Sequence, residues 1–283
     1  IVIDEAQDFG VAAFKVLKLV FPNCTFTIMG DVTQNINYFS GMNDWEALRQ
    51  EVFDPSRDKF YVLAKSYRNT VEISEYASRI LKKCSFRTYD IEPIIRHGKE
   101  VELKKLESEE AMLEETARII KDSRDRGYDT IAVICRDASE TVRVRELLMP
   151  YIESENVSAA EGAAMASMSA RDAMNDINEV NKIGKQAEGA KNDDNVSDKK
   201  KRSSAGKKKA NEGLEEAFEN VTFTKGLMVL PIYMTKGLEF DSVILWNPDE
   251  ESYPLNDADA KLLYVAVTRA LHELYIIYRE KLS

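Results

Sequence analysis

Residues 130–135 read Thr-Ile-Ala-Val-Ile-Cys, an apolar run placed between Asp129 and Arg136. A short run that is apolar at nearly every position is typical of a strand with both faces buried, as in a parallel sheet. A helix is expected to follow over residues 141–149 and to stop at Pro150. This strand and this helix together indicate an α/β unit.

The same alternation extends in both directions along the chain. We expect further strands at residues 1–3, 26–29, 101–106, 227–233, 243–246 and 274–278, and helices at residues 71–83, 111–120 and 258–271. Such alternation predicts a mostly parallel sheet covered by helices, which is the α/β class.

Residues 156–213 interrupt this pattern. They contain no aromatic residue and no proline, and near their end lies the lysine-rich run 199–209. Such a stretch buries too little apolar surface to offset the entropy lost on ordering. We therefore expect a disordered, low-complexity insert here, with the α/β pattern resuming at residue 214.

The composition is that of a globular protein, with 44% hydrophobic and 31% charged residues in a chain of 283. No apolar run approaches the roughly 18 residues of a membrane span, and no charged-then-apolar leader opens the sequence. The three cysteines and two histidines lie far apart, which excludes a disulfide scaffold and argues against a zinc cluster. These features favour a cytoplasmic protein.

The formal charge of −10 argues against a dedicated nucleic-acid binder, which usually carries a basic face. Residues 156–213 hold slightly more basic than acidic residues, so the rest of the chain is more acidic than the average indicates. We therefore expect the folded part alone to hold DNA weakly. The run 199–209 either binds nucleic acid or an acidic partner by charge, or is a solvated tether.

Two polar segments directly follow the two N-terminal strands. Residues 3–8 read Ile-Asp-Glu-Ala-Gln-Asp, and residues 28–34 read Ile-Met-Gly-Asp-Val-Thr-Gln. Loops at the carboxyl ends of parallel strands are where such sheets bind ligands. There Asp4 could hold Mg²⁺, Glu5 could orient or deprotonate an attacking water, and Gln34 could contact a phosphate. Solvated turns are the alternative for both segments.

Two arginines stand where an anion would suit them. Arg68, in Ser-Tyr-Arg-Asn at 66–69, comes just before a helix, whose N-terminus already favours negative charge. Arg269, in Tyr-Val-Ala-Val-Thr-Arg-Ala at 264–270, lies on a helix of small apolar residues. A phosphate would match the fork of its guanidinium group. Ion pairs with carboxylates are the alternative for both arginines.

The segment 233–241, Tyr-Met-Thr-Lys-Gly-Leu-Glu-Phe-Asp, lies between two expected strands. Gly237 would let the backbone approach a ligand closely. Glu239 could accept hydrogen bonds from a ribose hydroxyl. The segment is therefore a candidate nucleotide contact.

Taken together and in this order, the five segments resemble the motifs of superfamily 1 helicases of the UvrD/Rep type. Asp-Glu-Ala-Gln-Asp resembles motif II, Gly-Asp-Val-Thr-Gln motif III, Ser-Tyr-Arg-Asn motif IV, Thr-Lys-Gly-Leu-Glu-Phe-Asp motif V and Val-Ala-Val-Thr-Arg-Ala motif VI. The last two strings are highly specific, and the resemblance covers nearly the whole chain outside the insert. Residues 230–236 are most similar to the HelD (helicase IV-like) branch, because UvrD and Rep usually carry a histidine in place of Tyr233.

The resemblance implies a RecA-like fold in two parts. Residues 1–68 would be the C-terminal part of a first RecA-like domain, and residues 69–155 with 214–283 a complete second one. The insert 156–213 falls where longer relatives carry an accessory domain. No GxxxxGK[ST] phosphate loop occurs in the sequence. We therefore expect this chain to be the C-terminal part of a longer protein and not to hydrolyse ATP at a significant rate alone.

The resemblance also implies ATP and Mg²⁺ as cofactors, bound between the two domains. Asp4 would coordinate Mg²⁺, and Glu5 would activate the hydrolytic water. Gln34 would sense the γ-phosphate and couple it to the DNA site.

The remaining site residues would contact the nucleotide. Arg68 and Arg269 would stabilise charge on the transferring phosphoryl group, the second as an arginine finger. Gly237 and Glu239 would lie at the ribose and phosphates. Arginine fingers contribute about 10³–10⁵ in rate in NTPases generally.

Relatives place an aromatic pair and an arginine just after motif III, where bases of single-stranded DNA stack. Here the stretch reads Tyr38-Phe39-Ser40. Phe39 stands where a tryptophan is usual, and Ser40 replaces the arginine, so contact with the strand is expected to be reduced. Stacking on Tyr38 and Phe39 and burial of both rings in a core are equally compatible with the sequence.

The function implied is that of a DNA helicase or translocase, of which this chain is a fragment. ATP hydrolysis between two RecA-like domains would drive movement on single-stranded DNA. The alternative is a HelD-like factor that uses ATP to act on RNA polymerase rather than to unwind DNA.

Overall fold

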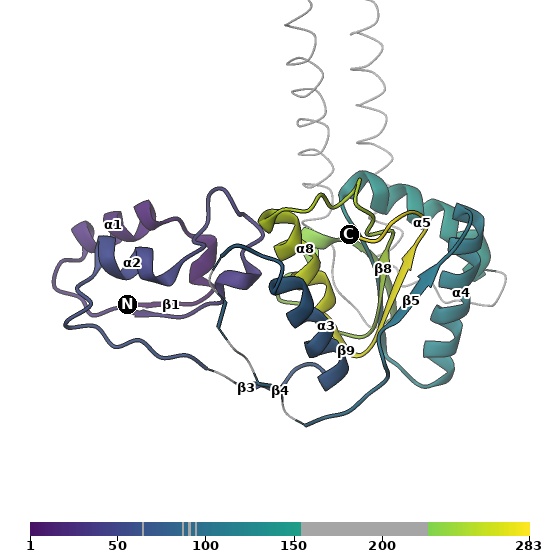
Figure 1. The fold of residues 1–283 in the computed structure, drawn as a ribbon, viewed down its shortest axis with the longest axis horizontal. Helices are drawn as coiled ribbons and strands as arrows, with labels where there is room; N and C mark the ends of the chain where they lie inside the picture. Colours follow the sequence, from purple (N-terminus) through teal and green to yellow (C-terminus); the bar gives the residue numbers. More distant parts are fainter. Residues whose placement is uncertain (64, 87, 90–91, 94, 154–225) are drawn as a thin grey trace, which may run out of the picture.

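A five-stranded parallel sheet forms the larger lobe of the computed structural model (Figure 1). The structure describes residues 1–63, 65–86, 88–89, 92–93, 95–153 and 226–283. The strands are β5 (Glu102–Lys105), β6 (Thr130–Cys135), β7 (Gly226–Pro231), β8 (Phe240–Trp246) and β9 (Ala270–Tyr278). They lie in the order β5-β9-β8-β6-β7, and every pairing is parallel. The predicted α/β class is confirmed.

The central strand β6 shows why the sheet is apolar on both faces. Its side chains alternate, so that Ala132 and Ile134 enter one hydrophobic cluster. Ile131, Val133 and Cys135 enter a second cluster on the opposite face. All five are buried, as the continuous apolar run predicts.

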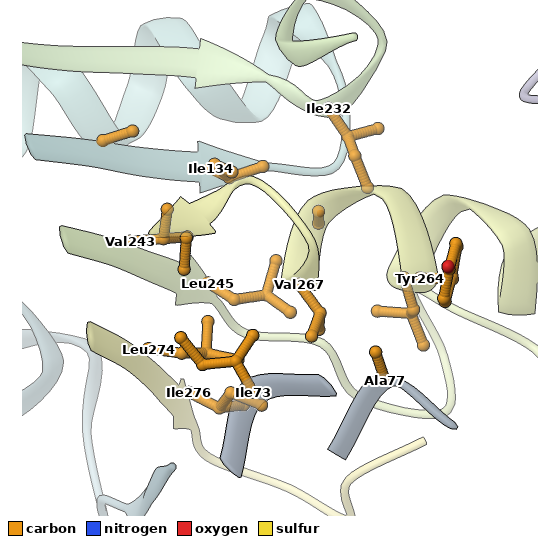
Figure 2. Packing of buried hydrophobic residues seen from close by; sticks show 14 of the residues in the cluster. Ile73, Ala77, Ile134, Ile232, Val243, Leu245, Tyr264, Val267, Leu274 and Ile276 are labelled. Carbon is orange, nitrogen blue, oxygen red and sulfur yellow. The ribbon is translucent and has the colours of Figure 1, made fainter. Parts of the chain in front are cut away.

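Helices cover both faces of this sheet. They are α3 (Val71–Leu81) and α8 (Asp257–Val267) on the first face, and α4 (Glu109–Asp125) and α5 (Ala138–Glu153) on the second. Figure 2 shows the first face, where side chains of α3 and α8 pack on those of β6, β8 and β9. The labelled side chains are Ile73, Ala77, Ile134, Ile232, Val243, Leu245, Tyr264, Val267, Leu274 and Ile276.

The N-terminal residues form a smaller lobe, drawn in purple in Figure 1. Its elements are β1 (Val2–Ile3), the 3₁₀ turn η1 (Ala6–Asp8), α1 (Val11–Val20), β2 (Thr27–Ile28), the 3₁₀ turn η2 (Val32–Gln34) and α2 (Trp45–Val52). Strands β1 and β2 pair in parallel, which brings the two polar segments that follow them side by side. The segment between the lobes carries β3 (Lys65–Ser66), which pairs in parallel with β4 (Glu92–Pro93).

Helices α3 and α8, which border the smaller lobe, begin at capping side chains. The hydroxyl of Thr70 accepts a hydrogen bond from the backbone N of Ile73, and Oδ1 of Asn256 accepts one from the backbone N of Asp259. Such caps satisfy backbone groups that have no partner inside the helix. The turn η2 contacts α8 directly, so the two lobes meet along this helix.

The prediction that a helix stops at Pro150 is wrong, because α5 continues to Glu153. A proline in a helix removes one hydrogen bond and costs about 3 kcal/mol in a helix interior. Here it lies in the last turns, and burial of Leu148 and Ile152 in the second cluster holds those turns against the sheet.

The expected strand 227–233 ends early, at Pro231, and residues 232–235 form the 3₁₀ turn η3 (Ile232–Thr235). Pro231 has no N–H to continue a ladder, and β7 is an edge strand. The hydroxyl of Thr235 then bonds the carbonyl oxygen of Ile232 at 2.7 Å, which closes the turn.

The expected helix 258–271 also ends early, at Val267. The hydroxyl of Thr268 bonds the carbonyl oxygens of Tyr264 and Val265, at 2.9 and 3.0 Å, and forms the C-terminal cap. Residue 270 already belongs to β9 and pairs with β8. Pairing in the sheet has therefore overridden the local helical pattern.

Residues 154–225 are outside the described part of the chain, and with them the expected insert 156–213 and the lysine-rich run 199–209. Within the described residues, every helix is too short or too polar to cross a membrane.

Candidate functional site

Asp4 and Glu5 lie at the carboxyl end of β1, as the sequence predicts. The backbone of Glu5 is left-handed, with φ 50° and ψ 38°, a conformation uncommon for residues with a side chain. Gln7, which is buried, donates from Nε2 to Glu5 Oε2 at 2.6 Å and accepts at Oε1 from the backbone N of Asp31 at 3.0 Å. One amide therefore fixes both loops, and unusual backbone held in this way is typical of functional sites.

The loop after β2 presents Gln34 to the larger lobe. Oδ1 of Asp31 accepts from the backbone N of Thr33 at 2.9 Å, and its Oδ2 accepts from Gln34 Nε2 at 2.9 Å. This orients the amide so that Oε1 of Gln34 faces Arg269, whose Nη2 donates to it at 3.1 Å. The structure thus brings together two predicted site residues that are far apart in the sequence.

Arg269 is fully buried at the boundary between the lobes. Its Nε donates to the carbonyl oxygen of Val265 at 3.0 Å, and its Nη1 to that of Leu238 at 3.3 Å. Burial, together with the nearby charge of Arg68, lowers the pKa of Arg269 to about 10. In the part of the chain that the structure describes, this guanidinium meets neutral acceptors and forms no ion pair. An anion would complete its environment.

Arg68 lies close to Arg269 and forms an ion pair of its own. Its Nε is 2.5 Å from Oε1 of Glu239, and both side chains are about one-third exposed. The ion-pair alternative considered for Arg68 is thus observed, and its partner is another predicted site residue. Arg96 Nη2 holds the adjoining backbone, since it donates to the carbonyl oxygens of Arg68 and Leu271 at 2.5 and 2.8 Å.

Asn69 connects the segments that carry the two arginines. Its Nδ2 donates to the carbonyl oxygens of Thr268 and Ala270 at 3.1 and 2.6 Å, and these two residues flank Arg269. Asn69 is itself buried and follows Arg68 directly. The sequence signal was present, because Asn69 ends the Ser-Tyr-Arg-Asn segment, but only the fold shows what its amide contacts.

Lys236 is a site residue that the sequence analysis did not single out. Its Nζ lies 2.5 Å from Oδ1 of Asp8 and 3.2 Å from Oε2 of Glu5, and its side chain is 13% exposed. This ion pair joins the two lobes beside the acidic loop. Gly237 follows with φ 79°, a left-handed conformation that glycine adopts without strain. The sequence feature that could have pointed to Lys236 is its position within the motif-like segment 233–241.

Asp4 remains a prediction as a metal ligand. Its side chain is exposed, and its Oδ1 accepts a hydrogen bond from the backbone N of Glu5 at 2.8 Å. Among the residues described here, no group of three or more potential ligands lies together. A single carboxylate fits Mg²⁺, which usually keeps several waters and takes its other ligands from substrate phosphates.

Tyr38 and Phe39 lie on the loop that follows η2. The two rings meet edge to face, with centres 5.5 Å apart. Phe39 is 95% exposed, so a core position is excluded for it, whereas Tyr38 is partly buried beneath Lys261. Phe39 is therefore accessible to a base, as a stacking residue must be, and its role in DNA binding stays a prediction.

The predicted residues thus fall into two groups. Those gathered at the boundary of the lobes are Glu5, Gln34, Arg68, Gly237, Glu239 and Arg269. Asp4 is exposed at the edge of this group, and Tyr38 and Phe39 lie on a separate loop. The first group combines two cations, one amide and two carboxylates, which is chemistry suited to a phosphorylated ligand with its metal ion.

Residues 226–277 match the sequence profile of the UvrD-like helicase C-terminal domain. The matched range runs from β7 to β9 and includes Lys236, Glu239 and Arg269. The resemblance to UvrD-type helicases is confirmed for this part of the chain, while the HelD branch stays a prediction. No curated protein is significantly similar in sequence.

The solved structures that match this chain include the following two. The C-terminal domain of a possible DNA helicase from Lactobacillus plantarum WCFS1 is 21% identical with a TM-score of 0.46, over 77% of this chain and 90% of that one. The structure of the PRRSV helicase is 13% identical with a TM-score of 0.40, over 98% of this chain and 34% of that one.

Proposed function

We propose that the chain is the C-terminal part of an ATP-dependent DNA helicase or translocase, in which hydrolysis between the two lobes drives movement along single-stranded DNA. The observation that carries this proposal is Arg269. A fully buried cation at the boundary of the lobes, with neutral acceptors around it in the described part of the chain, calls for an anionic ligand. The match of residues 226–277 to a helicase domain supports the same reading.

The arrangement gives each side chain a task with Mg·ATP, which supplies the phosphoryl group and the metal when bound. Arg68 and Arg269 would hold phosphate oxygens, and Asp4 would hold the metal ion. Gln34 is bonded to Arg269, so a shift of that arginine on hydrolysis is passed to the loop after β2. Glu5, held by Gln7, orients the attacking water.

Nucleotide binding tests the proposal directly. Purified chain is titrated calorimetrically with Mg·ATP and, separately, with pyrophosphate. The Arg269→Gln variant should bind both about 10- to 150-fold more weakly, because a hydrogen bond to a charged group contributes roughly 1.5–3 kcal/mol. The chain alone should show no significant turnover, since it lacks a phosphate loop.

Arg118 provides the matched control, because it is an arginine on the exposed side of α4, paired with Glu115 and Asp122. Arg118→Gln should leave nucleotide affinity unchanged. Equal affinity in the two variants would reject the proposed site. Clear DNA-stimulated turnover that disappears in Glu5→Gln would instead reject the expectation that the chain alone is inactive.

A HelD-like factor acting on RNA polymerase is the second candidate. The excess of acidic residues, with a formal charge of −10, favours a protein partner over a nucleic acid. Incubation with RNA polymerase and with a tailed DNA duplex separates the two functions. Strand separation supports the helicase, and ATP-dependent release of polymerase without strand separation supports the factor.

A further inference from the structure

Lys261 is a fully buried amine on α8, at the boundary of the two lobes. In the described part of the chain it forms no ion pair. Its Nζ donates to Oδ1 of Asn43 at 2.6 Å and lies 4.3 and 5.2 Å from the ring centres of Phe86 and Tyr38. Burial lowers the pKa of Lys261 to about 8, which shows how unfavourable this position is for a charge. A buried cation is tolerated where a structural or functional contact requires it.

Asn43 passes this contact to the loop after η2. Its Oδ1 also accepts from Asn35 Nδ2 at 2.9 Å, and its own Nδ2 donates to the carbonyl oxygen of Tyr38 at 2.6 Å. The backbone of Tyr38 is therefore held by Asn43, and the ring of Tyr38 lies under the ammonium group of Lys261. Lys261 therefore contacts the ring of Tyr38 directly and its backbone through Asn43. The hydroxyl of Tyr38 donates to Oδ2 of Asp257 on the same helix at 3.5 Å.

Phe39 follows Tyr38 and is 95% exposed, although its ring packs edge to face on the ring of Tyr38. Phe39 is thus an exposed aromatic ring next to a residue whose backbone is held by a hydrogen bond from Asn43, which is an arrangement suited to stacking. Bases of single-stranded nucleic acid stack on such rings whatever their sequence.

The same helix ends beside the proposed nucleotide site. Arg269 lies two residues beyond the end of α8, and the part of the helix from Lys261 to Val267 spans about 9 Å. Between them, Tyr264 is buried, and α8 packs against η2. Helix α8 therefore contacts both the loop that carries Phe39 and the segment beside the proposed nucleotide site.

We infer that Lys261 is the positioning residue through which α8 sets the orientation of Phe39 for stacking on a base of single-stranded DNA. This inference rests on the proposed function, because it takes the ligand of the loop to be nucleic acid. It adds one residue, Lys261, and a chain of contacts that runs from Lys261 through Asn43 and Tyr38 to Phe39.

A double-mutant cycle, in which the affinity for labelled oligothymidine is measured, tests this chain of contacts. Phe39→Ala should weaken binding about fivefold to a hundredfold, the range that loss of one stacked base produces. Lys261→Met keeps the length of the side chain and removes its charge, and should weaken binding several-fold. The double variant should bind no more weakly than Phe39→Ala, since Lys261 acts only through that ring. Additive losses would overturn the inference.

Leu263→Ala serves as the control for a merely structural effect. Leu263 is buried on the same helix in the first cluster, so its truncation destabilises α8 without touching the loop. This variant should retain the wild-type affinity for oligothymidine. A loss as large as that of Lys261→Met would show that general weakening of the helix explains both, and would overturn the inference.

A second measurement reads the position of the ring without DNA. A Phe39→Trp reporter is compared with and without Lys261→Met, after subtraction of the emission of Trp45 and Trp246. Its steady-state anisotropy should fall when Lys261 is replaced, because the ring is no longer held. Unchanged anisotropy would overturn the inference. Lower anisotropy with no effect of Phe39→Ala on DNA affinity would support the positioning role and reject the proposed contact with DNA.

Discussion

Replacement of Asn69 by alanine tests how the two arginines of the site are held together. The change removes the Nδ2 donor that bonds the carbonyl oxygens of Thr268 and Ala270 at 3.1 and 2.6 Å. Each bond contributes about 0.5–1.5 kcal/mol, and a buried acceptor left without a partner costs about 1–3 kcal/mol. Because Asn69 is buried, we expect a loss of about 2–4 kcal/mol in the free energy of unfolding.

Urea unfolding followed by far-UV circular dichroism measures this loss. For a domain of this size, it corresponds to a decrease in Tm of roughly 4–16 °C. Asn69→Asp should be more destabilising than Asn69→Ala, because a carboxylate would face two carbonyl oxygens. Asn23→Ala, at an exposed asparagine, is the control and should change stability by less than about 0.5 kcal/mol. A similarly small change for Asn69→Ala would refute the reasoning.

Three further predictions concern packing and titration. Gly30→Ala should destabilise the chain by about 1–3 kcal/mol in urea, because the new Cβ would clash with Oε1 of Gln7 and with the backbone N of Ala6; a neutral effect would contradict this. Ion pairing with Arg118 lowers the pKa of Glu115 to about 2. The stabilisation of the fold by this ion pair is therefore complete above the ordinary pKa of 4.5 and is lost as the pH falls towards 2. The difference in stability between wild type and Glu115→Gln should shrink over that interval, and a constant difference would be evidence against it. The pKa of Lys261, about 8 in the fold against 10.5 ordinarily, means that the unfolded chain binds more protons between these values. Between these two pH values, the free energy of unfolding of the wild type should therefore rise relative to that of Lys261→Met. A constant difference between the two proteins over this interval would contradict the prediction.

The fold was largely predictable because its signals are local. The strand at 130–135 and the helix beginning near residue 71 follow from their apolar patterns, and both are confirmed. The errors lie where a tertiary contact overrides the local pattern. The end of α8 is decided by pairing of β9 with β8, and the extension of α5 past Pro150 by burial of Ile152.

The sequence predicted which residues belong to the candidate site better than it predicted which contacts they make. The strings around Arg68 and Arg269 predict from the sequence alone that both are site residues, and the fold places the two arginines close together. The amide of Asn69 and the amine of Lys236 carry no signal of their own beyond these strings. Their partners lie about 200 residues away, so no local pattern reports them.

The sequence by itself determined the α/β class, the order of the polar segments along the chain and the identity of the charged residues that follow each strand. These properties depend on periodicity and on turns, which are set over a few residues. The tertiary structure alone decided that Gln34 meets Arg269, that Lys236 meets Asp8 and that the buried ammonium group of Lys261 lies over the ring of Tyr38. Each of these contacts joins the two lobes, and it exists because the packing of α8 on η2 brings distant segments within hydrogen-bonding distance.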